Sequence, residues 1–210
     1  MRMKNLTIIR HPLVQRDLTL LRDKKTPSHE FREILGRIST LMAYEVSRQL
    51  PLRKTTVNTP LARTTGWELS KPVVLVPILR AGLGLLPGFV DVMQDARVGH
   101  IGLYRDHESL QPVDYYFKVP RKLKSASVFL LDPMLATGGS SSAALTYLKA
   151  RGARSIVFVT LVASPEGVRM IQKEHPDVPI FTCAVDRKLD KRGYIIPGLG
   201  DAGDRVFGTE

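Results

Sequence analysis

The sequence predicts an α/β fold with a central, mostly parallel sheet flanked by helices. Between residues 73 and 185, apolar strand-like runs alternate with helix-like segments of about ten residues, which is typical of a parallel sheet covered on both faces. The chain has 210 residues, of which 43% are hydrophobic, so it is long enough for one sizeable α/β unit and too short for two. We therefore expect a single domain over residues 1–210.

The N-terminal part of the chain, residues 1–51, is predicted to be a helical segment that ends at a proline. Its apolar residues recur at a spacing of three and four, the helical period, at Phe31, Ile34, Leu35, Ile38, Leu41, Met42 and Val46. The Thr-rich residues 52–71 that follow predict a β-arm, in which Trp67 is a candidate anchor for a subunit contact.

Residues 72–186 are predicted to contain the core sheet. Strands are expected at residues 73–79, 100–105, 127–131, 156–162 and 180–185, with helices at 85–93, 143–152 and 165–175. Residues 106–125 are polar, include two prolines, and are predicted to form a loop. Ligands of such sheets bind at the carboxyl ends of the strands.

The segment DPMLATGGS, residues 132–140, lies between an apolar strand and a helix. Glycines let a phosphate approach the main chain, the helix N-terminus adds partial positive charge, and Thr137 and Ser140 add hydroxyl donors. The carboxylate of Asp132 is suited to ribose hydroxyls. A loop that merely caps the helix is an equal alternative for the TGGS turn, but the adjoining carboxylate favours a sugar phosphate. No Lys follows the glycines, so this is not a Walker A loop.

Two further segments follow predicted strands. PILRAGLG, residues 77–84, carries Arg80, whose guanidinium can form bidentate bonds with phosphate oxygens. Its glycines do not fit a dinucleotide-binding turn, because the third glycine position holds Pro87. Arg105 ends the next strand; a solvated Arg on a plain surface loop is the simple alternative for it.

The C-terminal residues 193–205 contain four glycines and a proline, which predicts a fixed irregular loop. This segment closely resembles the uracil-binding segment of the uracil phosphoribosyltransferases. DPMLATGGS is similar to the motif with which these type I phosphoribosyltransferases bind 5-phospho-α-D-ribose 1-diphosphate (PRPP), with Pro133 where the wider superfamily has a second acidic residue. The resemblance implies the type I phosphoribosyltransferase fold, with residues 187–210 as a base-binding hood.

The resemblance also implies roles for individual residues. Its catalytic residues would be Arg80, Arg105, Asp132 and Asp201, all of which would contact PRPP, and the superfamily often has a non-proline cis peptide near Leu79-Arg80. The other PRPP-binding residues would be Pro133, Met134, Leu135, Ala136, Thr137, Gly138, Gly139 and Ser140. Uracil would meet main-chain groups of Ile195, Gly200, Asp201 and Ala202.

The implied reaction converts uracil and PRPP to UMP and diphosphate in pyrimidine salvage. We expect Mg²⁺ to arrive bound to PRPP, because no cluster of carboxylates in the sequence forms a dedicated metal site. We also expect a homodimer or homotetramer, with a dimer joined through the arm as the minimum. Whether GTP is an effector, as in some relatives, is left open.

Two alternatives remain. The net charge of +11 is compatible with an RNA-binding regulator on the same fold, although the basic residues are dispersed and we expect no nucleic-acid partner. A phosphoribosyltransferase for a purine base would predict a side-chain carboxylate or Lys in the base loop. The sequence has no membrane-length apolar run and no signal-peptide core, and its single Cys183 fits a reducing compartment, so we expect a cytoplasmic protein without a membrane partner.

Overall fold

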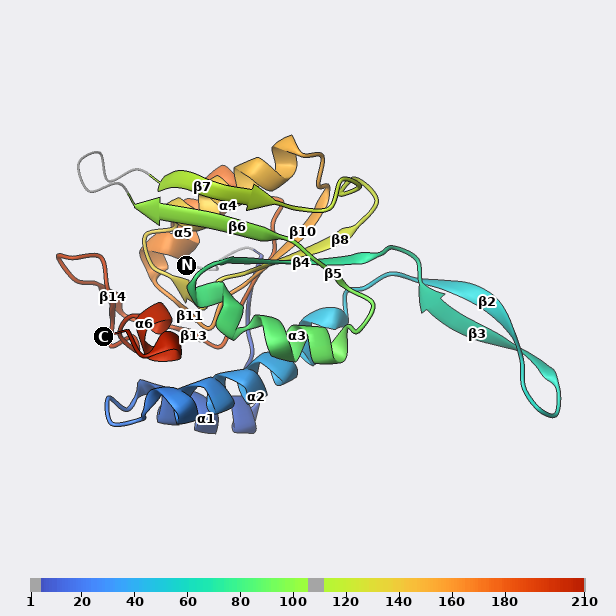
Figure 1. Cartoon of the computed structure of the whole chain (residues 1–210), viewed down its shortest axis with the longest axis horizontal. Helices are drawn as coiled ribbons and strands as arrows, with labels where there is room; N and C mark the ends of the chain where they lie inside the picture. Colours follow the sequence, from blue (N-terminus) through green and yellow to red (C-terminus); the bar gives the residue numbers. More distant parts are fainter. Residues whose placement is uncertain (1–4, 106–111, 210) are drawn as a thin grey trace.

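The computed structural model describes residues 5–105 and 112–209. Its main sheet has eight strands in the order β1-β12-β10-β8-β4-β6-β7, with β5 also paired to β4, and all pairs are parallel except β6–β7 (Figure 1). The strands are β1 (Leu6–Ile8), β4 (Val73–Leu79), β5 (Arg97–Val98), β6 (His100–Arg105), β7 (Pro112–Lys118), β8 (Ser127–Leu131), β10 (Ser155–Val159) and β12 (Ile180–Thr182). The predicted mostly parallel α/β fold is confirmed.

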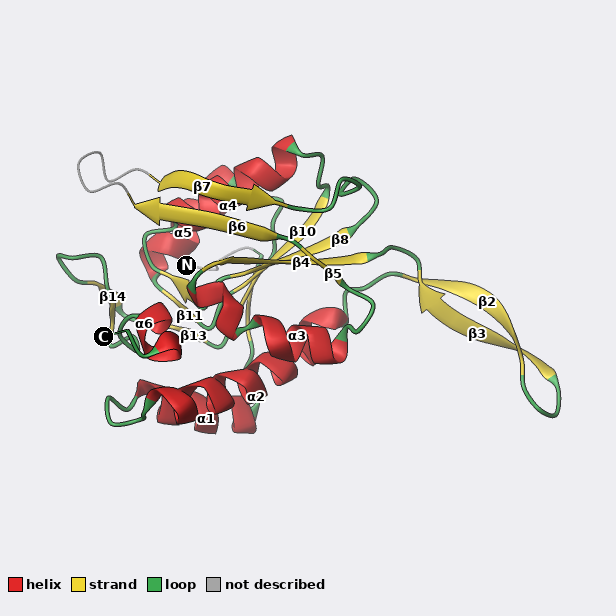
Figure 2. Cartoon of the chain, viewed as in Figure 1, coloured by secondary structure: helices red, strands yellow, loops and turns green. Residues whose placement is uncertain are grey.

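Helices cover both faces of this sheet (Figure 2). They are α1 (Pro12–Arg22), α2 (Ser28–Ser47), the 3₁₀ helix η1 (Ala81–Gly84), α3 (Leu86–Val92), α4 (Gly139–Ala150), α5 (Pro165–Glu174) and α6 (Ala202–Phe207). Side chains alternate along β4 and β8: Leu75 and Phe129 join the core with α1, α2, α3 and α6, whereas Val74 and Val128 join the core with α4 and α5. Both faces are buried, which explains the continuous apolar runs.

The first strand corrects the prediction that residues 1–51 are entirely helical. Leu6–Ile8 form β1, which pairs in parallel with β12 at the sheet edge. A three-residue strand is too short to show a period in the sequence, so only tertiary pairing reveals it. The predicted helical period is confirmed in α2, where Phe31, Ile34 and Ile38 are buried.

The predicted β-arm is confirmed. β2 (Leu52–Asn58) and β3 (Arg63–Leu69) pair antiparallel over their full length and project from the body of the molecule (Figure 1). The side chain of Trp67 is exposed, with its ring 5.8 Å from the Lys54 ammonium.

The prediction of a loop over residues 106–125 is wrong for its middle part. β7 pairs antiparallel with β6, with a register irregularity between Gly102 and Leu103. β7 is the last strand of the sheet, and Pro112 is its first residue, a position that tolerates a missing N–H donor. Residues 106–111 lie outside the described part of the chain.

Short strands extend the carboxyl ends of the central strands. β9 (Met134–Leu135), β11 (Val162–Ala163) and β13 (Ala184–Val185) form a parallel three-stranded sheet, and β14 (Lys188–Leu189) pairs antiparallel with β15 (Ile195–Ile196). The candidate site lies on this side of the molecule. In residues 5–105 and 112–209 there is no helix that combines the length and the apolar character needed to cross a bilayer.

Candidate functional site

Asp132 is fixed directly beyond the end of β8. Its backbone N–H donates to the carbonyl of Val159 at 3.1 Å, which continues the pairing of β8 with β10. Its carboxylate Oδ1 accepts the N–H of Met134 at 3.2 Å. The side chain therefore faces the loop that follows it, rather than the core.

The carboxyl group of Asp132 has a pKa well above the ordinary value of an aspartate. Desolvation by the surrounding protein raises its pKa from 3.8 to about 7, the hydrogen bond from Met134 opposes this, and the negative charge of Asp201 adds to it. The charge of Asp201 thus acts on Asp132, although the residues are far apart in the sequence. Groups perturbed in this way cluster at functional sites.

The start of α4 is open rather than capped. Its N-cap residue is Gly138, in the left-handed conformation with φ +90°, and no side chain bonds the N-terminal N–H groups as a cap. The hydroxyl of Thr137 lies 3.5 Å from the N–H of Gly139, a long contact, and Thr137 is exposed. The first N–H groups of α4 thus have no side-chain cap, an arrangement that suits an anion.

The loop before α4 is held from behind by the start of α5. Ser164 donates through its backbone N–H to the carbonyl of Leu135 at 2.9 Å and through its hydroxyl to the carbonyl of Ala136 at 2.6 Å. A Cβ atom on Gly167 would overlap the carbonyl oxygen of Ala136. Sequence reasoning missed this support. The sequence predicts a helix over residues 165–175, but no pattern in it indicates that the start of this helix contacts the loop.

Arg80 follows β4 and turns toward the C-terminal residues. The peptide bond Leu79-Arg80 is cis, which confirms the prediction. The guanidinium of Arg80 lies 3.0 Å from Oδ1 of Asp204 and 5.8 Å from the ring of Phe207. Hydrogen bonds from Thr209 and from Arg80 lower the pKa of Asp204. Sequence reasoning missed Asp204 as a partner of Arg80.

Of the other predicted arginine, the structure describes only the backbone. Arg105 is the last residue of β6, and β6 lies beside β4, so its backbone is on the same edge of the sheet as Arg80. Its side chain lies outside the described part of the chain.

The C-terminal hood contains more regular structure than predicted. Within residues 193–205, Ile195 is buried in β15 and Ala202 begins α6, so the expected wholly irregular loop is corrected. Gly200 has φ +78°, and Asp201 caps α6 by accepting the N–H of Asp204 at 2.9 Å. A cap with an exposed carboxylate is compatible with a second partner for Asp201.

The elements bring three predicted side chains to one region. A Cβ atom on Gly203, in the first turn of α6, would lie 3.2 Å from Oδ1 of Asp201 and 3.9 Å from the guanidinium of Arg80. Asp132 is within electrostatic reach of Asp201. Among residues 5–105 and 112–209, no three His, Cys, Asp or Glu side chains gather as a metal-binding group. The site thus offers two carboxylates, one guanidinium and an open helix start.

Comparison with known proteins agrees with this arrangement. A family model described as uracil phosphoribosyltransferase matches residues 8–209. A uracil phosphoribosyltransferase of Acidovorax ebreus is 56% identical over 209 residues, which cover 99% of this chain and 100% of the relative.

Solved structures are similar as well. A protein of Aquifex aeolicus has a TM-score of 0.92 and 35% identity, covering 98% of this chain and 99% of its own. A hypoxanthine phosphoribosyltransferase of Staphylococcus aureus, 12% identical with a TM-score of 0.53 over 80% of this chain and 85% of its own, shares the fold alone. The match along nearly the whole chain means that this protein belongs to the uracil phosphoribosyltransferase family.

Proposed function

We propose that this protein transfers the phosphoribosyl group of PRPP to uracil, giving UMP and diphosphate in pyrimidine salvage. One observation of the structure carries the proposal: the loop that begins with Asp132 at the carboxyl end of β8 leads, through β9, to the uncapped start of α4. The N–H groups at the start of α4 suit the phosphate of a ribose 5-phosphate, and the carboxylate of Asp132 suits the hydroxyls of its ribose. Family membership supplies uracil as the base.

The PRPP site is assigned to the loop and to the residues around it. Asp132 holds the ribose, and the backbone from Ala136 to Ser140, through Thr137, Gly138 and Gly139, holds the 5′-phosphate. Pro133, Met134 and Leu135 connect the two parts, and β9 fixes them by pairing with β11. Uracil lies against main-chain groups of Ile195, Gly200, Asp201 and Ala202, since a planar base with alternating donors and acceptors suits a rigid backbone.

The reaction is a displacement at the anomeric carbon. The bond from this carbon to the diphosphate oxygen breaks and takes its electron pair with the diphosphate, while a bond to the uracil nitrogen forms and the proton of that N–H group passes to the departing diphosphate or to water. Arg80 and Arg105 are assigned to the charge that develops on the diphosphate, and Asp132 and Asp201 to the electron-poor sugar. Positioning and charge stabilisation supply most of the rate enhancement, and no residue is assigned here as a general base.

Mg²⁺ fits this site as a companion of PRPP. Carboxylate oxygens are the ligands that it prefers, and Asp132 and Asp201 provide them without forming a closed metal site in the described chain. When bound, the ion neutralises the charge of the diphosphate. Asp201, which is exposed, and Asp132 would contact it from the protein side.

The role of Arg80 is open to a direct test. Arg80→Ala should lower kcat/KM roughly 100-fold or more while the protein stays folded, because the guanidinium acts on the leaving group. Arg16→Ala is a matched control: both side chains are more than half exposed and both are paired with a carboxylate, Arg16 with Asp17 at 2.7 Å. Full activity in Arg80→Ala would remove this residue from the mechanism.

We also propose that two chains associate through the β-arm. The arm exposes large apolar side chains, among them Leu61 at 96% and Trp67 at 60% exposure. At its base, a cleft of about 1110 Å³ lies between the arm and the segment that follows α3. Exposed apolar side chains beside a cleft suit a second protein surface. Whether GTP is an effector is tested by adding GTP to the assay.

A further inference from the structure

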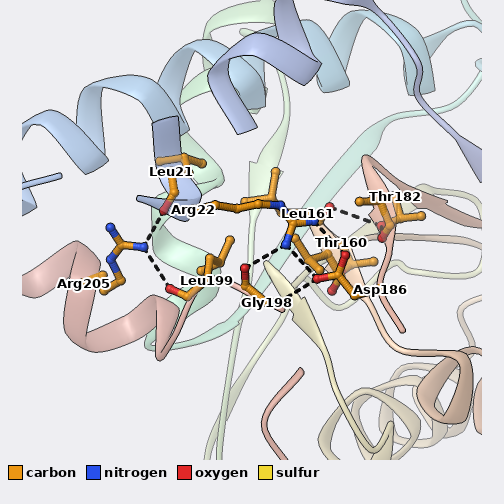
Figure 3. A network of polar contacts seen from close by, with 11 residues as sticks. Leu21, Arg22, Thr160, Leu161, Thr182, Asp186, Gly198, Leu199 and Arg205 are labelled. Atoms are coloured by element: carbon orange, nitrogen blue, oxygen red, sulfur yellow. Dashed lines mark hydrogen bonds and ion pairs between the residues drawn. The ribbon is translucent and has the colours of Figure 1, made fainter. Parts of the chain in front are cut away.

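An ion pair links the end of α1 to Asp186, the residue directly before the hood. Arg22 is the last residue of α1, and its guanidinium nitrogens Nη1 and Nη2 lie 2.7 Å from Oδ2 and Oδ1 of Asp186, respectively (Figure 3). The side chains are 24% and 7% exposed. A bidentate pair of this kind fixes direction as well as distance.

The same two side chains hold both polar backbone groups of Gly198. Oδ2 of Asp186 accepts the N–H of Gly198 at 2.8 Å, and Nη1 of Arg22 donates to its carbonyl at 2.8 Å (Figure 3). Gly198 has φ +58°, and a Cβ atom there would overlap the carbonyl of Ile195. The ion pair therefore determines the orientation of a tight turn between Ile195 and Gly200.

A second arginine holds the next residue from the other side. Arg205 of α6 donates to the carbonyl of Leu199 at 2.9 Å and to the carbonyl of Leu21 in the last turn of α1 (Figure 3). It also donates to the carbonyl of Asp23, the C-cap residue of α1, at 2.7 Å. Helix-terminal carbonyls have no partner within their own helix, so these bonds join the helix end to the hood.

We infer that Arg22 and Asp186 are positioning residues for uracil: they hold the Gly198 turn so that the flanking main-chain groups match the base. The inference rests on the proposed function. A template made of backbone groups has no side chain that can adjust to the base, so its accuracy depends on what holds it. The anchored turn separates the two proposed uracil contacts, Ile195 and Gly200–Ala202, whereas the loop proposed for the 5′-phosphate is supported independently by Ser164.

The test measures the KM for uracil and the KM for PRPP separately in steady-state kinetics. In Arg22→Gln and in Asp186→Asn, KM for uracil should rise about tenfold. This is the factor expected when binding loses the free energy of about one hydrogen bond. The KM for PRPP and kcat should stay within roughly threefold of the wild type, because the sugar site and the leaving-group arginines are untouched. Arg22→Lys should give an intermediate KM for uracil, since an ammonium lacks the planar fork.

Arg16→Gln is the control for a general effect on α1. Arg16 lies on the same helix and also contacts a buried carboxylate, that of Asp17 at 2.7 Å, but it bonds within α1 rather than to the hood. The Arg16→Gln substitution should leave the KM for uracil and the KM for PRPP unchanged. Circular dichroism and thermal unfolding are recorded for every variant. If Arg22→Gln does not fold, the isosteric Asp186→Asn decides.

An unchanged KM for uracil in folded Asp186→Asn or Arg22→Gln would overturn the inference, as would equal increases in KM for uracil and for PRPP. Neither result touches the proposed function, which fails separately if the wild-type protein does not convert uracil.

Discussion

At the scale of single residues, the carboxyl group of Asp132 is proposed to contact a ligand, yet the surrounding protein shields it from water. The protein around it raises its pKa from 3.8 to about 7, and the charge of Asp201 contributes to the rise. In the proposed role, the ionised carboxylate of Asp132 accepts hydrogen bonds from two ribose hydroxyls, whereas the protonated group has less acceptor capacity. The activity and the stability of the protein should therefore depend on pH in opposite directions near neutrality.

For activity, kcat/KM for PRPP should rise with pH through about 7, the pKa of Asp132. At one pH unit below this value only about a tenth of the carboxyl groups are ionised, so we expect roughly a tenfold difference between pH 6 and pH 8. Asp132→Asn should be less active at every pH. The ratio of wild type to variant cancels the titration of PRPP itself, and a ratio that does not change with pH would contradict the assignment.

For stability, the sign is reversed. Because the folded-state pKa of Asp132 is raised, the native protein binds more protons than the unfolded chain between about pH 4 and pH 7. Its contribution to the free energy of unfolding is thus present below pH 4 and is lost as the pH rises through 7. Asp132→Asn should gain stability relative to the wild type on going from pH 4 to pH 8, as measured by urea unfolding. A constant difference would show that the carboxyl is not desolvated.

Gly167 tests the support of the phosphate loop. A Cβ atom there would overlap the carbonyl of Ala136, so Gly167→Ala should displace the loop and raise KM for PRPP several-fold more than KM for uracil. Gly36→Ala is the control, because a Cβ atom at Gly36 in α2 has nothing within 4 Å. That variant should keep its kinetics and gain about 0.5–1 kcal/mol of stability. Identical kinetics in both variants would mean that the loop tolerates the contact.

At the scale of elements, the sequence predicts those helices and strands whose residue pattern is visible within the element itself. The buried strands β4 and β8 are continuous apolar runs, and α2 shows a clear helical period, so each is visible in its own residues. β1 and β7 are not, because one has three residues and the other begins with Pro112 in a polar region. Pairing with a neighbouring strand decides their structure, and that information lies elsewhere in the chain.

The same reason separates the predicted site residues from the missed ones. Asp132, Arg80 and the glycines follow strand ends, where a side chain that binds a ligand differs visibly from a core residue. Arg22 and Asp186 are 164 positions apart and each resembles an ordinary surface charge. Only the fold shows that they meet at Gly198. Positioning residues of this kind are the part of a site that residue patterns do not reveal.

The β-arm leads to a prediction about assembly. Replacing Leu61 and Trp67 with Ser removes exposed apolar area from the arm and should shift the protein from two or more chains to one. Light scattering after gel filtration measures the mass directly. Neither side chain is buried in the body, so thermal stability at low protein concentration should change little. A wild-type protein with the mass of one chain would contradict association through the arm.

At the scale of the whole molecule, the topology explains why distant segments form one site. Parallel strands place the ends of β4, β6 and β8 on the same edge, and the short sheet of β9, β11 and β13 extends that edge toward the hood (Figure 1). α1 and α2 lie beneath the C-terminal segment and hold it through Arg22, Arg205 and a bond from Arg32 to the carbonyl of Val206 at 2.8 Å. In the proposed assignment, the N-terminal helices therefore support the segment that binds the base, and the central sheet supports the residues that bind the sugar.

The most direct test of the function is a competition between bases. Uracil, hypoxanthine and cytosine are supplied together in equal amounts with PRPP and Mg²⁺, and the nucleotide products are identified by mass spectrometry. We predict UMP and an equal amount of diphosphate, with neither product when uracil is left out. Formation of IMP without UMP would contradict the proposed function and show that the hood accepts a purine.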